Sequence, residues 1–155
     1  MAAMTDYLEN KLIDWFFRAQ AIGITGATAA AGTGPANLYF GLLTAAPSDS
    51  SGGTEVSGGS YARVQVVAGT TTFANTQASG TGASSGTGGT TSNSSTITFP
   101  APTGNWGSVT HFGVYDASSG GNLLIHGALT TAKTVNNGDA APSFAAGAFT
   151  FQIDN

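Results

Sequence analysis

The sequence predicts a mainly β fold, an antiparallel β-sandwich or barrel of about seven to eight short strands with one N-terminal amphipathic α-helix. Two observations carry this prediction. Apolar residues recur with helical spacing only near the N-terminus, between residues 5 and 20. In the rest of the chain, apolar and polar residues alternate in short strand-like segments, which are separated by clusters of Gly, Ser and Asn that favour turns.

The helix is predicted from Thr5 to about Gln20. One of its faces carries a continuous apolar stripe, whereas Ile13 and Phe17 point away from that stripe. A helix that is apolar on more than one side is buried on more than one side, either by its own chain or by a neighbouring subunit, and the sequence leaves both open. The stripe consists of Leu8, Leu12, Trp15, Phe16 and Ala19. The second alternative predicts an assembly interface on the helix, formed by Leu8, Leu12, Ile13, Trp15, Phe16 and Phe17.

The β-rich part is predicted to begin after a flexible connector. Gly and Pro exclude a regular helix from this connector, residues 21–36, and a single β-sandwich domain is expected over residues 37–155. Residues 37–44 form a near-continuous apolar run, which is typical of a strand buried on both faces. The remaining predicted strands are 61–68, 95–99, 108–116, 123–129, 133–136 and 146–153, and a Gly-rich turn joins 108–116 to 123–129 in a hairpin.

Two long loops interrupt the predicted strands, at residues 45–60 and 75–95. Loops of more than about 12–15 residues in a compact domain are usually functional or disordered. The second loop has no large apolar residue, so we expect it to be mobile in an isolated monomer. If it is ordered, the sequence predicts that something external orders it.

The composition excludes several classes of function. Of 155 residues, 23 are Gly and only 8% are charged, against about 25% in an ordinary globular domain. The chain has only four basic residues, so we expect no direct contact with nucleic acid, which is bound by clustered Lys and Arg. It has no cysteine, and therefore no disulfide or thiolate metal site. No apolar run approaches the length of a membrane span, so no membrane association is predicted.

The titratable residues of the sequence form no catalytic or metal-binding pattern. The only histidines, His111 and His126, fall on either side of one predicted hairpin and could be near cross-strand neighbours, with Asp116 as a third candidate ligand. A catalytic zinc site typically needs three protein ligands, and the sequence has no matching spacing. Asp116 and Asp139 lie in Gly-containing turns, where Asp forms local backbone hydrogen bonds. We therefore predict no catalytic residue, no cofactor and no metal.

Two aromatic residues remain as candidates for surface binding, Trp106 and Tyr61. Trp106 precedes a predicted strand in a Pro- and Gly-rich segment. Two interpretations are open: an exposed Trp is a stacking platform for sugars, whereas a buried one closes the open end of a sandwich.

Several segments resemble a family of small proteins encoded by tailed bacteriophages. They include Trp106-Gly107-Ser108-Val109-Thr110-His111-Phe112-Gly113-Val114-Tyr115-Asp116 and Leu38-Tyr39-Phe40-Gly41-Leu42-Leu43-Thr44-Ala45-Ala46-Pro47-Ser48-Asp49, together with residues 5–18, 58–64 and 137–147. They occur in order over nearly the whole chain. Members of this family are commonly labelled tail-fibre proteins, which is a loose label, and this chain resembles a capsid decoration or cement protein. The resemblance implies a structural component of the virion, assembled in the host cytoplasm, with no enzymatic activity.

The position in the virion is left open by the resemblance. The first expectation is a capsid decoration protein that stabilises the shell by contacts between subunits, as a homotrimer bound to the major capsid protein or to other virion proteins. The alternatives are a tail-fibre, tail-tip or collar component, and a receptor- or glycan-binding module.

Overall fold

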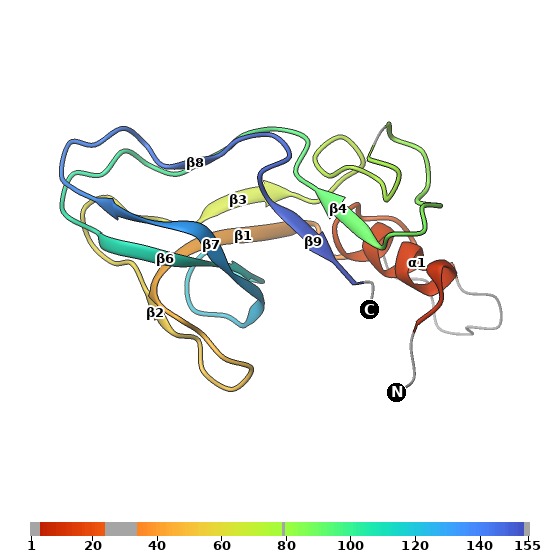
Figure 1. The fold of residues 1–155 in the computed structure, drawn as a ribbon, viewed down its shortest axis with the longest axis horizontal. Helices are drawn as coiled ribbons and strands as arrows, with labels where there is room; N and C mark the ends of the chain where they lie inside the picture. The colour runs from red at the N-terminus through yellow and green to blue at the C-terminus, as the bar shows by residue number, and fades with distance from the viewer. Residues whose placement is uncertain (1–3, 24–33, 79, 154–155) are drawn as a thin grey trace. The chain divides into compact units, whose positions relative to one another are not determined.

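The structure is a computed structural model that describes residues 4–23, 34–78 and 80–153 (Figure 1). It confirms the mainly β fold with antiparallel sheets and an N-terminal helix, and in this part of the chain no sheet closes into a barrel. The elements in chain order are α1 (Asp6–Phe16), β1 (Asn37–Ala45), β2 (Thr54–Glu55), β3 (Val64–Val67), β4 (Thr90–Ser92), β5 (Ile97–Thr98), β6 (Gly107–Tyr115), β7 (Leu123–Val135), β8 (Ser143–Phe144) and β9 (Thr150–Gln152).

The chain forms two compact units, each made of segments that are distant in the sequence. Unit 1 contains residues 1–36, 67–97 and 144–155, and unit 2 contains residues 37–66 and 98–143. This grouping places α1 with β4 and β9, whereas the sequence suggested a separate helix, a connector and one domain over 37–155. Residues 24–33 of the predicted connector lie outside the described residues.

The main sheet of unit 2 is built around β1. Its strand order is β2-β1-β6-β7, and β3 also pairs with β1. Because β1 has neighbours on both edges and covering residues on both faces, Leu38, Phe40 and Leu43 are completely buried. This confirms the strand predicted from the apolar run at residues 37–44.

The β6–β7 hairpin is also present, with Gly120 and Gly121 in its turn at positive φ. Strand β7 is longer than predicted, because the segments 123–129 and 133–136 join in one strand of 13 residues. The register shifts between Val109 and His111 of β6, so that extra residues of β7 bulge out of the ladder there. The bulge lets the two predicted segments continue as one strand, although the pairing register with β6 differs between them.

Two glycines that face each other across β1 and β6 make room for an aromatic ring. Gly41 pairs with Gly113, and the Tyr115 ring lies over both. A Cβ at Gly41 would stand 2.9 Å from the ring carbon Cε2 of Tyr115 and 3.0 Å from the Tyr61 hydroxyl. The absence of side chains at this point lets Tyr115 and Tyr61 lie close against the sheet.

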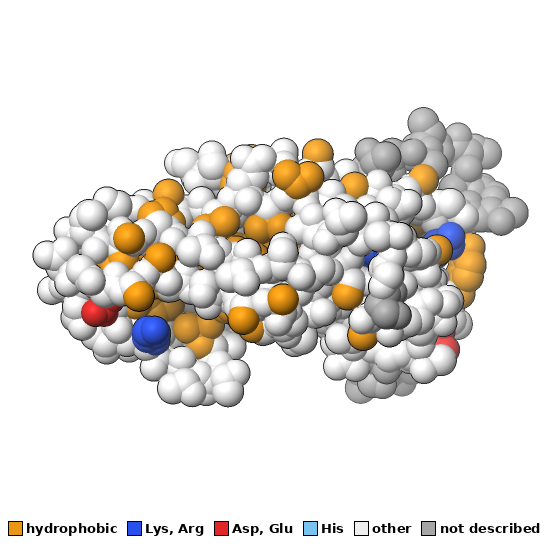
Figure 2. Space-filling model, turned by 90° about the horizontal axis from the view of Figure 1, so that it is seen from above, with side chains coloured by type: hydrophobic (Ala, Val, Ile, Leu, Met, Phe, Trp, Pro, Cys, Tyr) orange, Lys and Arg blue, Asp and Glu red, His pale blue; other side chains and the backbone are white. Residues whose placement is uncertain are grey.

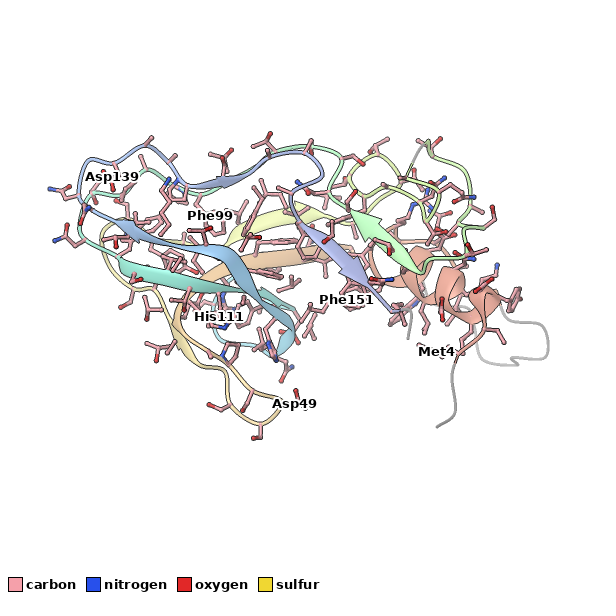
Figure 3. The ribbon with its side chains drawn as sticks, viewed as in Figure 1. Met4, Asp49, Phe99, His111, Asp139 and Phe151 are labelled. Carbon is pink, nitrogen blue, oxygen red and sulfur yellow. The ribbon has the colours of Figure 1, made fainter. Side chains whose placement is uncertain are left out.

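Unit 1 has an aromatic core at the end of α1. The Phe17 ring lies 5.2 Å from the Phe73 ring, 6.1 Å from the Phe149 ring and 5.1 Å from the Phe151 ring, between centroids. Phe151 is labelled on β9 in Figure 3. The helix ends at Phe16, before the predicted Gln20, because the chain turns at Ala19 with a φ of 52°. This early turn brings Phe17 into the core.

The buried side chain of Asn93 connects the strands and loops of unit 1. Its Nδ2 donates to the carbonyl oxygens of Ser95 and Ala145, both at 2.8 Å, and its Oδ1 accepts the Phe149 N–H at 2.9 Å. Asn93 is only 1% exposed, so these bonds satisfy a polar side chain that has no contact with water.

We expect Gly41→Ala to destabilise unit 2 by about 1–3 kcal/mol, because the new methyl group overpacks the space under Tyr115 and Tyr61. Denaturant unfolding measures this loss. Gly52→Ala is the matched control, since a Cβ at Gly52 meets no atom within 4 Å. Equal effects of the two substitutions would contradict the close approach at Gly41.

Candidate functional site

Helix α1 buries the face that carries most of its polar side chains. The residues on this face recur at helical spacing and include a complete ion pair. Ile13 and Arg18 are completely buried, and Phe17 is 1% exposed. The buried residues of α1 are Glu9, Asn10, Ile13 and Asp14, and Phe17 and Arg18, directly after the helix, continue this face.

The opposite face of α1, which carries the predicted apolar stripe, is half exposed. Leu8, Leu12, Trp15 and Phe16 are each only partly covered, and Tyr7 beside them is 54% exposed. Of the six residues predicted to form an assembly interface, Ile13 and Phe17 are instead buried in the core of their own unit. Leu8, Leu12, Trp15 and Phe16 are partly buried, with the Phe16 ring 4.9 Å from the Phe17 ring between centroids, and a role for them in assembly stays a prediction. We call Leu8, Leu12, Trp15 and Phe16 the open face of α1.

The polar side of α1 is buried because it binds the loop at residues 75–86. Arg18 Nη2 donates to the Gly82 carbonyl oxygen at 2.7 Å, and its Nη1 donates to the Asp14 carboxylate. The two oxygens of Asp14 accept the N–H of Ser84 at 2.8 Å and its hydroxyl at 2.5 Å. Loop groups thus bind both Arg18 Nη2 and the Asp14 carboxylate, whereas Arg18 Nε is buried without a hydrogen-bond partner in the described residues.

A second set of bonds holds the same loop one helical turn earlier. Asn10 Nδ2 donates to the Gly86 carbonyl oxygen at 2.9 Å, and Asn10 Oδ1 accepts the Thr76 hydroxyl. The Gly86 N–H donates to the Thr76 hydroxyl oxygen at 2.8 Å. In the described residues, α1 of the same chain therefore binds part of the loop for which the sequence suggested an external partner, and the mobility expected for residues 75–95 stays a prediction. Composition alone missed this, because Gly, Ser and Thr supply the backbone and hydroxyl groups that Asn10, Asp14 and Arg18 bind.

Unit 2 contains a comparable cluster around Arg63. Its Nε and Nη2 donate to the two carboxylate oxygens of Glu55 at 2.8 and 2.7 Å. Its Nη1 donates to the carbonyl oxygens of Ala117 and Gly120 in the β6–β7 turn, both at 2.8 Å. The guanidinium carbon stands 3.4 Å from the centroid of the Tyr115 ring, in cation–π contact. Arg63 therefore ties β2, the β6–β7 turn and β6 together.

The tyrosines of this cluster are held in their neutral form. The Tyr61 hydroxyl donates to Glu55 Oε1 at 2.8 Å and accepts the Leu42 N–H at 2.9 Å. Burial raises the pKa of Tyr61 far above its ordinary value, and the hydrogen bond and negative charge of Glu55 raise it further. Burial also raises the pKa of Tyr115, against the lowering effect of Arg63. The Glu55 hydrogen bond raises the pKa of Arg63, which stays charged.

Trp106 and Tyr61, considered from the sequence as surface-binding aromatics, pack against each other. Trp106 is 4% exposed, and its Nε1 donates to the Gly59 carbonyl oxygen at 2.9 Å. Its ring meets the Tyr61 ring edge-on at 5.3 Å between centroids. Of the two interpretations of Trp106, this burial agrees with a Trp that closes the open end of a sandwich, because neighbours in unit 2 cover both the ring and its N–H donor.

The two histidines lie on one face of the sheet, two positions apart in register. His111, labelled in Figure 3, pairs with Ala128, and His126 pairs with Gly113. Thr110 Oγ1 stands 2.8 Å from His111 Nδ1, and Asp49 stands 3.9 Å from His126 Nε2. Across residues 4–23, 34–78 and 80–153, no three His, Asp or Glu side chains gather in a group that could hold a metal ion.

Asp116 and Asp139 have the turn roles that the sequence predicts. Asp116 accepts the backbone N–H and the side-chain amide of Asn122, both at 2.7 Å, and these bonds lower its pKa. Asp139 accepts the Asn136 N–H at 2.8 Å. Both carboxylates therefore accept hydrogen bonds from residues of their own turns.

No helix in the described residues is long and apolar enough to cross a membrane.

The sequence matches the protein family described as podophage GP4 fiber I protein gp80, over residues 3–152. The chain belongs to this family. The match confirms the resemblance to small virion proteins of tailed phages that the sequence segments carry. No curated protein matches the chain. As a member of the gp80 fibre family, the chain is a structural virion protein.

We expect Arg18→Met to destabilise the chain by about 3 kcal/mol, because it leaves the buried carboxylate of Asp14 without its partner. Denaturant unfolding measures the loss. Lys11→Met on the same helix is the control, since Lys11 makes no ion pair in the described residues and should change stability by less than about 0.5 kcal/mol. A small effect of Arg18→Met would contradict the central role of the ion pair.

Alkaline pH should destabilise unit 2. Because the pKa values of Tyr61 and Tyr115 are raised in the folded state, their contribution to stability is complete below the ordinary tyrosine pKa and is lost as pH rises above it. The denaturant concentration at the midpoint of unfolding should therefore decrease as the pH is raised from about 8 to about 11. Tyr61→Phe should make this decrease smaller. Tyr7→Phe, at an exposed tyrosine, is the control and should leave it unchanged.

Proposed function

We propose that the chain is a non-enzymatic structural component of the tail-fibre apparatus of a podophage particle. The observation that carries this proposal is the match to a podophage fibre family, which extends over nearly the whole chain. The described side-chain clusters support a structural role. The carboxylates of Asp14 and Glu55 are bound by arginines, and those of Asp116 and Asp139 by turn groups.

The same proposal assigns the open face of α1 to assembly. Its four residues are apolar and half exposed, although the buried face of the same helix is largely polar. Apolar side chains left at the surface while charged ones are buried suit a contact with another protein of the virion. We therefore propose that the open face packs against a neighbouring virion protein.

Quantitative mass spectrometry of purified particles, with labelling of the chain in electron micrographs, tests the location. We expect a low copy number set by the symmetry of the tail and label at the tail. A copy number that matches the capsid subunits, with label over the shell, would contradict the tail proposal and support capsid decoration.

Substitution of the open face tests its role separately. Leu12→Ser should leave the chain folded, because Leu12 is only half covered, but should reduce its incorporation into particles. Lys11→Ser, at the neighbouring half-exposed position, is the matched control and should be incorporated normally. Normal incorporation of a folded Leu12→Ser chain would contradict the assignment of this face to assembly.

A further inference from the structure

The turn that follows β7 contains the dipeptide Asn137-Gly138. The Asp139 N–H donates to the Asn136 carbonyl oxygen at 3.2 Å and closes this turn, and Asp139 is labelled in Figure 3. Gly138 has a φ of 82°, whereas Asn137 has no positive φ, which is the pattern of a type II turn. Both residues of the dipeptide are exposed, so that water reaches the Asn137 side chain.

An asparagine that is followed by glycine is prone to deamidation, because glycine has no side chain to hinder the reaction. The backbone nitrogen of Gly138 would attack the side-chain carbon Cγ of Asn137, and its proton would pass to the leaving amide, which departs as ammonia. The new C–N bond closes a succinimide ring, and one water molecule then opens this ring to aspartate or isoaspartate. Asn137 is the only asparagine of the chain that precedes a glycine.

Two hydrogen bonds to the segment before β6 hold the backbone of this dipeptide. The Gly138 N–H donates to the Pro102 carbonyl oxygen at 3.0 Å. The Asn137 N–H donates to Asn105 Oδ1 at 2.9 Å. The nitrogen that would attack Cγ therefore already serves as a donor, and its neighbour along the backbone is fixed as well.

We propose that Asn137 is a deamidation site which the contact with residues 102–105 protects, so that the reaction proceeds when the turn detaches from this segment. Local opening of a surface turn is fast compared with a chemical step of this kind. The rate therefore follows the fraction of molecules in which the turn is detached. The inference rests on unit 2 alone and not on the proposed location in the virion.

Deamidation would change this turn in two ways. Aspartate at position 137 adds a negative charge two positions before Asp139, in a chain that has net charge −4 and only four basic residues. Charged side chains are also sparse on the molecular face that Figure 2 shows. Isoaspartate adds one carbon to the backbone and so lengthens the turn that the Asp139 N–H closes. Both products should loosen the connection between β7 and β8.

Peptide mass spectrometry of the full chain, incubated in mildly alkaline buffer, measures conversion at Asn137. We expect slow conversion in the folded chain and much faster conversion in guanidinium chloride. Asn105→Ala removes the acceptor of the Asn137 N–H and should speed conversion in the folded chain by about two- to tenfold, the effect of one lost hydrogen bond on the detached fraction. Asn105→Asp keeps an oxygen acceptor at this position and should react as slowly as the unsubstituted chain.

Gln65→Ala is the matched control, because it removes a side-chain amide that donates to Asn37 Oδ1 at 2.8 Å elsewhere in unit 2. It should leave the rate at Asn137 unchanged. Circular dichroism establishes that each variant is folded during the incubation. If Asn105→Ala does not fold, the comparison of the folded and unfolded unsubstituted chain still decides.

Equal rates in the folded and the unfolded chain would overturn the protection, as would a folded Asn105→Ala chain that reacts no faster than Gln65→Ala. Absence of conversion at Asn137 in the unfolded chain would overturn the site itself. None of these results would bear on detection of the chain in tail fibres.

Discussion

Both units of this protein depend on one kind of interaction, an arginine that binds a carboxylate and the carbonyl oxygens of a Gly-containing segment. In unit 1, Arg18 joins Asp14 to Gly82. In unit 2, Arg63 joins Glu55 to the β6–β7 turn. These are the only two arginines in the chain. Because Gly- and Ser-rich segments have little apolar surface to bury, a guanidinium with several fixed donors supplies the contacts that a larger core would otherwise provide.

This requirement explains the orientation of α1. If the apolar stripe faced the core, Asp14 and Arg18 would lie in water and the loop at residues 75–86 would lose the side chains that bind it. Ser84 and Gly82 supply further hydrogen bonds that offset part of the cost of burying the ion pair. The helix therefore stabilises its own unit with its polar face and leaves Leu8, Leu12, Trp15 and Phe16 half exposed.

The open face of α1 offers apolar side chains for the contact that we propose with another virion protein. A chain with only 8% charged residues gives such a surface little electrostatic repulsion to overcome.

Local sequence patterns predict the strand-rich class, the buried run that forms β1, the β6–β7 hairpin and the turn roles of Asp116 and Asp139. These features are local, because alternation, turn residues and short-range hydrogen bonds are all visible within a few positions. The resemblance to small virion proteins of tailed phages is likewise visible in contiguous segments of the sequence. The orientation of α1 and the burial of Trp106 depended on partners far along the chain, such as Ser84 for Asp14 and Gly59 for Trp106. Only the tertiary structure could decide these features, because a periodic pattern shows which side chains share a face but not which groups elsewhere satisfy them.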